Sequence, residues 1–273
     1  MAIHTTDAIV LRKHNIRETS LMGVFYTRDF GKIRGLIKGA RGPRGTLGYQ
    51  VQIFTLNRIV FYDCRRSGVH TVSQCDLLDF FESIREDILR TSYACYFIEL
   101  IDAFTEDKDA SSSEKIYNLL LNSLELLKTK ASPKRISRIL EIKLLMVSGL
   151  MPRLDKCVLC DKPIDFRHSK ADKARFSYKS GGLICQGCLK EDSDSCRILP
   201  GTAHFIDHVG RAPYEKAAMI KVSKGVGIEL EEIMKKFLDY HLDRQIKSLE
   251  FLRKIEGVLP FVHRAASKGI DFS

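Results

Sequence analysis

Four cysteines in two closely spaced pairs are the residues whose types and spacing most directly imply chemistry. The pairs are Cys157-Val-Leu-Cys160 and Cys185-Gln-Gly-Cys188, with the 24 residues 161–184 between them. Each pair places two thiols on one tight turn, and two such turns supply four soft, anionic ligands, as zinc takes in closed structural sites. Gly181-Gly182 precedes the second pair and permits a sharp backbone turn. The sequence therefore predicts a structural zinc site at Cys157, Cys160, Cys185 and Cys188.

Two redox-active CxxC sites, or buried free thiols, are the alternatives for the same four residues. A thioredoxin-like CxxC belongs in a βαβ unit, and the segment around these cysteines does not have that pattern. We therefore favour bound zinc. Outside the two pairs, the cysteines expected to act as small buried hydrophobic residues are Cys64, Cys75, Cys95 and Cys196.

The composition is that of an ordinary globular protein with an excess of basic residues. Of the 273 residues, 44% are hydrophobic and 29% charged, and the net charge is +10. Met1–Asp7 has neither a basic start nor an apolar run behind it, and the apolar stretch Tyr93–Ile98 is too short to cross a bilayer. We therefore expect a cytoplasmic protein with reduced thiols and no membrane association.

Most of the net positive charge lies between residues 32 and 66. This stretch holds eight basic residues and one acidic residue, Asp63, and so carries +7 of the net charge. Clustered Lys and Arg side chains are typical of surfaces that bind nucleic acid or an acidic protein tail. The residues predicted to contact DNA phosphates are Lys32, Arg34, Lys38, Arg41, Arg44, Arg65 and Arg66. For each residue taken singly, a solvated charged face is the alternative.

The first 78 residues have the pattern of short strands separated by turns. Strands are predicted over residues 8–11, 21–27, 32–37, twice within 51–62, and over 68–73. About five short strands of this kind favour a small closed barrel, of which the OB-fold is the smallest common type. The aromatic residues expected in its core are Phe25, Phe54 and Phe61. The candidates for stacking on nucleic-acid bases are Phe30, Tyr49 and Tyr62.

From residue 79 onward, the apolar residues recur at helical spacing. Helices are predicted over residues 80–104, 114–128 and 133–148, from about 202, and over 224–242. The fold class is therefore α+β, an N-terminal OB-fold barrel followed by an all-α domain with an inserted four-cysteine zinc-binding segment. The predicted domains are 1–78 (barrel), 79–150 and 197–257 (the two parts of the helical domain), 151–196 (zinc-binding insertion) and 258–273 (C-terminal tail).

Two further residue pairs on predicted helices are candidate sites. Arg135 and Arg138 lie one helical turn apart and could receive an acidic partner peptide, with a solvated helix face as the alternative. His204 and His208 are four residues apart, but no glutamate of an HExxH motif lies between them, which favours surface histidines. The sequence also has no phosphate-binding loop and no nucleophile elbow. We therefore predict that the chain is not an enzyme.

Several stretches of this chain together carry a family resemblance. They are Arg17–Ser20, Thr27–Gly31, Lys38–Arg41, Gly149–Cys160, Phe176–Cys188 and Tyr240–Ser248. Their order and sequences resemble the RecO family of bacterial recombination mediators, and the stretch that ends in Cys160 is the most specific. Two departures stand out. Asp161 occupies a position where the family usually has glycine, and the loop Arg41–Gly48 has three glycines but lacks the expected serine and basic pattern.

The resemblance implies a non-enzymatic protein that binds single- and double-stranded DNA and anneals complementary strands. It also implies that the protein recognises the acidic tail of single-strand binding protein and, with the partner RecR, helps to load RecA on coated single strands. A nucleoid-associated location follows from these roles. The alternatives are a zinc-containing DNA repair enzyme, such as a glycosylase or nuclease, and a zinc-knuckle transcription regulator. A repair enzyme would need an acidic or nucleophilic residue in a DNA-lined cleft, and the sequence identifies none.

Overall fold

The computed structural model describes residues 2–16, 18–41, 47–64, 68–107, 110–164, 174–242 and 244–266. By their contacts, the elements group into two compact units. Unit 1 comprises residues 1–133 and 246–273, and unit 2 comprises residues 134–245. Within the described ranges, no helix has both the length and the apolar character needed to span a bilayer.

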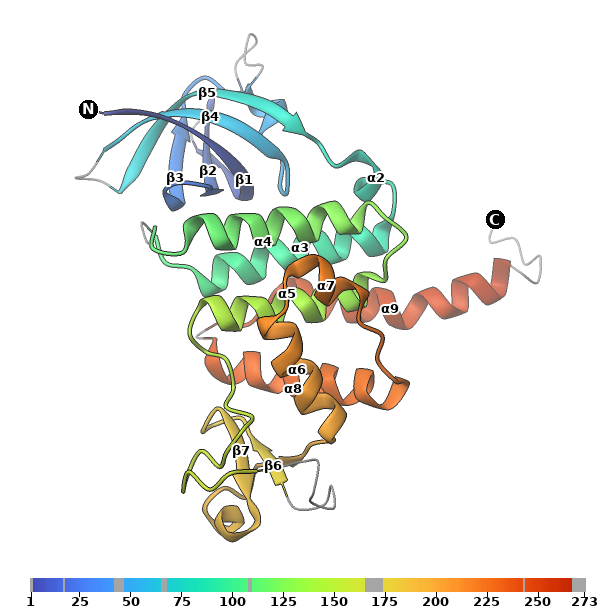
Figure 1. Ribbon diagram of the computed structural model, residues 1–273. Helices are drawn as coiled ribbons and strands as arrows, with labels where there is room; N and C mark the ends of the chain where they lie inside the picture. Colours follow the sequence, from blue (N-terminus) through green and yellow to red (C-terminus); the bar gives the residue numbers. More distant parts are fainter. Residues whose placement is uncertain are drawn as a thin grey trace. The chain divides into compact units, whose positions relative to one another are not determined.

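Unit 1 begins with a closed five-stranded barrel (Figure 1). Its strands are β1 (Ile3–Ile16), β2 (Ser20–Thr27), β3 (Gly31–Ile37), β4 (Leu56–Tyr62) and β5 (Val69–Asp79). The order around the barrel is β1-β2-β3-β5-β4, and β3 and β5 form the one parallel pair among these strands. The predicted OB-like barrel is therefore confirmed.

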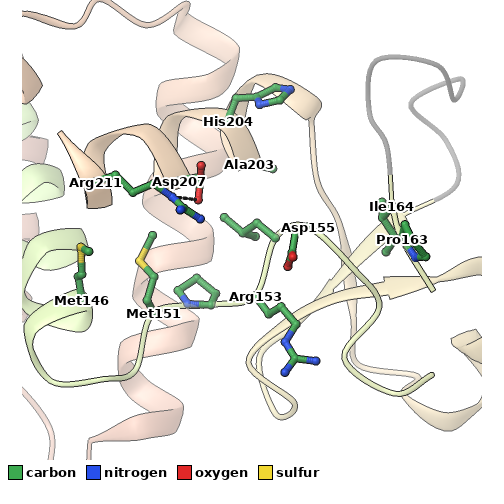
Figure 2. A pocket seen from close by; sticks show the side chains of 12 residues that line it. Met146, Met151, Arg153, Asp155, Pro163, Ile164, Ala203, His204, Asp207 and Arg211 are labelled. Atoms are coloured by element: carbon green, nitrogen blue, oxygen red, sulfur yellow. Dashed lines mark hydrogen bonds and ion pairs between the residues drawn. The ribbon is translucent and has the colours of Figure 1, made fainter. Parts of the chain in front are cut away.

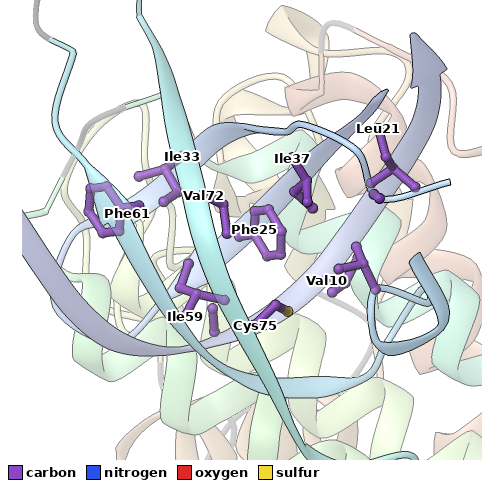
Figure 3. Close-up of a cluster of buried hydrophobic side chains, with 12 residues drawn as sticks. Val10, Leu21, Phe25, Ile33, Ile37, Ile59, Phe61, Val72 and Cys75 are labelled. Carbon is purple, nitrogen blue, oxygen red and sulfur yellow. The ribbon is translucent and has the colours of Figure 1, made fainter. Parts of the chain in front are cut away.

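Alternate residues of these strands fill the barrel interior (Figure 3). The ring of Phe25 lies at the centre of this core and covers Gly23 and Gly35, which are paired across β2 and β3. A Cβ atom on Gly35 would lie 2.5 Å from Cγ2 of Val72 and 3.2 Å from the Phe25 ring. The absence of a side chain at this position therefore lets the ring and the strand pack closely. Phe25 and Phe61 belong to this core, as predicted, whereas Phe54 is buried in the turn before β4.

The segment between β3 and β4 differs from the prediction. The predicted strand at the start of residues 51–62 is absent, and a short helix, α1 (Leu47–Gln50), leads instead into a turn. The hydroxyl of Thr55 closes this turn by donating to the carbonyl oxygens of Gln50 and Gln52, at 3.2 and 2.7 Å. Phe54 has a φ of 50°, a left-handed conformation that ends any extended run. Side-chain hydrogen bonds of this kind compete with strand pairing, which explains the wrong prediction.

Besides α1, the described residues of unit 1 form four further helices. They are α2 (Glu82–Arg85), α3 (Ile88–Phe104), α4 (Ser113–Leu127) and α9 (Lys247–Ala266). The helix predicted over 80–104 is divided, because the carboxylate of Asp87 caps α3 by accepting from the backbone N–H groups of Leu89 and Arg90. α3 and α4 lie against the barrel.

Helix α9 follows unit 2 in the sequence but belongs to unit 1, where it packs along α3 (Figure 1). The Glu99 carboxylate caps its start by accepting from the N–H groups of Lys247 and Ser248, at 3.1 and 2.8 Å. The compact units therefore do not follow the predicted domain boundaries, because α9 belongs with the barrel and α3. The predicted C-terminal tail, 258–273, begins inside this helix, so the expectation of a loose tail was wrong as far as Ala266.

Unit 2 consists of four helices and a small sheet. The helices are α5 (Pro133–Val147), α6 (Pro200–Arg211), α7 (Tyr214–Met219) and α8 (Lys224–His241). The sheet has the order β7-β6-β8 and is formed by β6 (Ala174–Ser177), β7 (Gly182–Cys185) and β8 (Cys196–Arg197), with the short helix η2 (Gln186–Glu191) after β7. The helices predicted over 133–148, from about 202 and over 224–242 are confirmed.

Candidate metal centre and nucleic-acid interface

The four cysteines predicted as metal ligands lie together at one point of unit 2. The Sγ atoms of Cys157, Cys160, Cys185 and Cys188 are all within 4.8 Å of one another. The Sγ atoms of Cys160 and Cys185 are 3.7 Å apart. In the part of the chain that the structure describes, no other group of three or more His, Cys, Asp or Glu side chains is arranged to hold a metal ion. Four sulfurs at this spacing could hold one ion.

Backbone contacts between the two cysteine turns set this geometry. The N–H of Val158 donates to the carbonyl oxygen of Leu183 at 2.8 Å, which ties the first turn to strand β7. The N–H of Cys185 donates to Sγ of Cys157 at 3.3 Å. A Cβ atom on Gly182 would lie 2.4 Å from the carbonyl oxygen of Arg153, so only glycine allows this close approach. The neighbouring Gly181 has a φ of 71° in the turn before β7, which confirms the prediction that this glycine pair permits a sharp turn there.

Asp161 lies in the first cysteine turn with a φ of 56°, where a residue with a side chain is strained. Its N–H donates to the carbonyl oxygen of Cys157 at 3.0 Å, so the conformation is part of the turn that presents the first two thiols. The structure thus explains why a glycine suits this position. Arg153 and Lys156 hold the Asp161 carboxylate at 2.8 and 3.1 Å, and the hydrogen bond from Lys156 is the main reason that its pKa is lowered.

The surroundings shift the thiol pKa values of Cys157 and Cys188 in opposite directions. Burial opposes ionisation of Cys157, but backbone N–H groups, including that of Cys185, point at its sulfur and bring its pKa down to about 6. Burial raises the pKa of Cys188 to about 12. The apolar side chains of Val158 and Ile164 pack against this cluster. A bound cation would favour the thiolate form at all four positions, because metal binding displaces thiol protons.

A pocket of about 960 Å³ lies in the same unit, between the end of α5, residues 151–155 and α6 (Figure 2). Its apolar part includes Met146 and Met151, and its charged side chains have both signs. Arg211 and Asp207 neutralise each other across 2.8 Å, so the pocket does not present the single sign of charge that would attract a polyanion. His204 and His208 are both exposed on α6, in agreement with the prediction of surface histidines.

Two of the residues predicted to contact DNA, Lys32 and Arg34, form ion pairs within unit 1. Lys32 is 7% exposed, and its Nζ atom donates to the carbonyl oxygen and the carboxylate of Asp102, at 2.9 and 3.3 Å. Arg34 pairs with Asp107 at 2.7 Å. The prediction for Lys32 was wrong, because this side chain fastens the barrel to α3. The sequence offered one signal, the acidic residues at 102 and 107, but not their proximity to strand β3.

Lys38 and Arg41 are predicted DNA contacts that are exposed, as Arg34 is, but without its ion pair. Neither forms an ion pair with any carboxylate in the described residues. The backbone N–H of Arg41 donates to the carbonyl oxygen of Thr19 at 3.0 Å, which holds the loop after β3 against the turn between β1 and β2. Lys38 and Arg41 therefore place two exposed positive charges in the loop that follows β3. Three predicted contacts, Arg44, Arg65 and Arg66, lie outside the described residues.

The predicted partner site on α5 is largely buried. The Arg138 side chain is 12% exposed and donates to the carboxylate of Glu141, which is 0% exposed, at 2.7 Å. The guanidinium therefore neutralises a buried charge. Contrary to the expectation, Arg138 is not available to an acidic peptide. Arg135 is half-buried and donates to the carbonyl oxygen of Ala218 at 3.4 Å. Arg135 and Arg138 do lie one turn apart on a helix, as predicted, but both are partly buried and not on an open face.

Comparison with known proteins gives consistent matches over nearly the whole chain. The family models described as "Recombination protein O N terminal" and "Recombination protein O C terminal" match residues 1–81 and 85–250. The chain is 34% identical over 252 residues to the DNA repair protein RecO of Alkaliphilus metalliredigens, covering 92% of this chain and 98% of that one. For the DNA repair protein RecO of Symbiobacterium thermophilum, the identity is 30% over 253 residues, with 92% and 97% covered.

Proposed function

Since the chain belongs to the RecO family of DNA repair proteins, we propose that it acts as a DNA-binding recombination mediator. In this proposal it binds single- and double-stranded DNA and anneals complementary strands without turning over a substrate. With RecR, it helps to load RecA on single strands coated with single-strand binding protein. The acidic tail of that protein is a further partner, and the site of action is the nucleoid in the cytoplasm.

The observation that carries the proposal is the exposed pair Lys38 and Arg41 at one end of an OB-like barrel. Small barrels of this type bind single strands through a basic groove that follows the sugar–phosphate backbone. Because phosphate contacts do not depend on base identity, a surface of this kind tolerates any sequence. A mediator that acts wherever DNA is damaged needs this tolerance.

The four-cysteine cluster supports zinc as the metal, in a structural role. A zinc–sulfur bond of about 2.3 Å places the sulfurs of a regular tetrahedron about 3.8 Å apart. The separation of 3.7 Å between Cys160 Sγ and Cys185 Sγ fits this spacing. When bound, zinc would supply a charge that fixes the two turns and would activate no water, because four thiolates fill its coordination. Cys157 and Cys185 would also keep the hydrogen bond that already joins them.

Annealing of complementary oligonucleotides coated with single-strand binding protein tests the proposed function. We expect the protein to accelerate annealing in the absence of any nucleotide triphosphate. The double variant Lys38→Ala, Arg41→Ala should lose most of this acceleration. The matched control Lys216→Ala, Lys221→Ala removes two exposed charges from unit 2 and should retain it.

Two parallel assays separate the alternatives. Cleavage or base release from nicked, damaged or single-stranded oligonucleotides would point to a repair enzyme. Strong preference for one duplex sequence in a competition assay would point to a transcription regulator. If annealing is not accelerated by the wild-type protein under any salt condition, the mediator proposal fails.

A further inference from the structure

Tyr49 is the most exposed of the three aromatic residues that the sequence offered as stacking candidates. It is 80% exposed, whereas Phe30 and Tyr62 are half-buried and Phe30 packs against the barrel core. Most aromatic rings of the barrel interior, such as Phe25 at 0%, are withdrawn from solvent. A large ring that stays in water forgoes the stabilisation that burial would give, so its exposure calls for an explanation other than packing within this unit.

The backbone that carries Tyr49 is held in place on both sides. The N–H of Gly48 donates to the carbonyl oxygen of Ala40 at 3.2 Å, and a Cβ atom at 48 would lie 2.5 Å from that oxygen. On the other side, the Gln52 side-chain amide donates to the carbonyl oxygen of Gly48 at 3.3 Å, and the Thr55 hydroxyl donates to that of Gln50 at 3.2 Å. The ring is therefore presented from an anchored turn, which lowers the entropy cost of binding to it.

The loop that is hydrogen-bonded to the backbone at Gly48 carries two exposed basic residues. Ala40, which bonds to Gly48, lies between Lys38 and Arg41, the two exposed basic residues of the loop after β3. Gln52 accepts a hydrogen bond from the Nζ atom of Lys13 on strand β1. Neither Lys38 nor Arg41 is neutralised by a carboxylate that the structure describes. A hydrogen bond thus joins the backbone next to Tyr49 to the loop that carries both cations. An exposed aromatic ring together with cations is the combination that single-stranded nucleic acids recognise, through base stacking and phosphate contact.

We propose that Tyr49 is a stacking platform for an unpaired nucleobase whose neighbouring phosphates contact Lys38 and Arg41, and that it gives this protein a preference for single strands over duplex. The proposal rests on the proposed DNA-binding function and adds a specificity-determining residue to it. In a duplex, each base face is covered by its neighbours in the stack, so the ring has nothing to stack on. The phosphates are available in both forms.

Binding to one oligonucleotide, measured as a single strand and as a duplex at one salt concentration, tests the proposal. Tyr49→Ala should weaken single-strand binding by about 5- to 150-fold, the range that corresponds to loss of one base stack. Duplex binding should change less than about 3-fold, because phosphate contacts are kept. Tyr49→Phe retains the ring and should bind single strands as the wild type does. The matched control Tyr240→Ala removes a 54% exposed tyrosine from unit 2 and should have no effect.

A single strand with consecutive abasic sites provides a second readout. The wild type should bind this abasic strand more weakly than it binds the normal strand. Tyr49→Ala should bind the abasic strand no more weakly than the wild type does. Wild-type-like single-strand binding by Tyr49→Ala, or equal losses for single strand and duplex, overturns the inference while leaving DNA binding intact. Absence of DNA binding by the wild-type protein would instead refute the proposed function and the inference with it.

Discussion

The Nζ atom of Lys32 lies 3.3 Å from the Oδ1 atom of Asp102, and this pair joins strand β3 of the barrel to helix α3. Arg12 approaches the other carboxylate oxygen of Asp102 at 3.0 Å, so two barrel residues share one carboxylate that is 1% exposed. Lys32 also donates to the carbonyl oxygen of Thr105, close to the end of α3. The positive charge at position 32 is therefore used to dock the helix on the barrel.

Replacing Lys32 should destabilise unit 1 and leave the intrinsic affinity for DNA nearly unchanged. Lys32→Met keeps the length of the side chain but removes one of the two cations at Asp102. Leaving a buried charge short of a partner costs about 3–5 kcal/mol, and we expect a value near the lower end because Arg12 remains. Urea denaturation monitors the loss. Lys38→Met is the matched control on an exposed lysine, and its effect should stay within about 0.5 kcal/mol. Equal stability of the two variants would contradict the anchoring role.

The glycine pair under Phe25 should not tolerate a methyl group. In Gly35→Ala, the new Cβ atom would lie 2.5 Å from Val72 Cγ2, so strand or ring must move. Overpacking of this kind costs about 1–3 kcal/mol. Gly257→Ala is the control in the same unit, because its Cβ atom would meet nothing within 4 Å in helix α9. That variant should gain about 0.5–1 kcal/mol from the higher helix propensity of alanine. Thermal or urea unfolding of both variants gives the comparison, and a Gly35→Ala variant as stable as the wild type would show that the core is not closed there.

Removal of metal should loosen the four-cysteine segment before it affects the barrel. Backbone hydrogen bonds such as Val158 to Leu183 and Arg153 to Gly181 join this segment, and a proposed zinc ion bound by the four thiolates would add to its stability. Hydrogen exchange with and without a chelator should show faster exchange over residues 151–164 and 182–191. Exchange in strands β2 and β3 should not change. Equal protection of the cysteine segment in both conditions would rule out a structural role for the metal.

Two substitutions at Asp161 should have opposite effects on the stability of unit 2. Asp161→Gly removes the strain of a φ of 56°, and the ion pairs that it loses are exposed and contribute little. Asp161→Ala keeps the strain, loses the same ion pairs and also loses a residue type that tolerates left-handed backbone. We therefore expect the glycine variant to retain metal at a higher chelator concentration than the wild type, and the alanine variant to release it at a lower one. The reverse order would mean that the carboxylate, not the backbone, stabilises this turn.

The salt dependence of single-strand binding should identify which basic residues contact phosphates. Each phosphate contact contributes roughly −0.7 to the slope of log affinity against log salt, and about four contacts give a slope of roughly −3. Lys38→Ala and Arg41→Ala should each make the slope shallower by about 0.7. Arg58→Ala is the control, because its guanidinium already pairs with Asp7 at 2.8 Å and should leave the slope unchanged. Affinity that does not fall with added salt would contradict an electrostatic interface.

Features that depend on residues close together in the sequence could be predicted. The two CxxC turns, the helix that begins at Pro133 and the helix over 224–242 all follow from local spacing. The barrel followed from strand-length apolar runs and turn residues, because alternation along a strand decides which side chains face inward. The strand predicted at the start of residues 51–62 does not form, because the hydroxyl of Thr55 closes a turn where the apolar residues suggested a strand.

Only the tertiary structure decided which charged and aromatic side chains reach the solvent. Lys32 and Lys38 are six residues apart in one basic stretch, yet the first is buried on Asp102 and the second is exposed. Arg138 likewise lies on a helix that was predicted, but its side chain pairs with the buried Glu141. A sequence determines its own local periodicity, whereas the burial of a charge depends on which carboxylate, distant in the sequence, packs against it. For that reason the cluster of four cysteines could be predicted from spacing alone, and the exposure of the basic side chains could not.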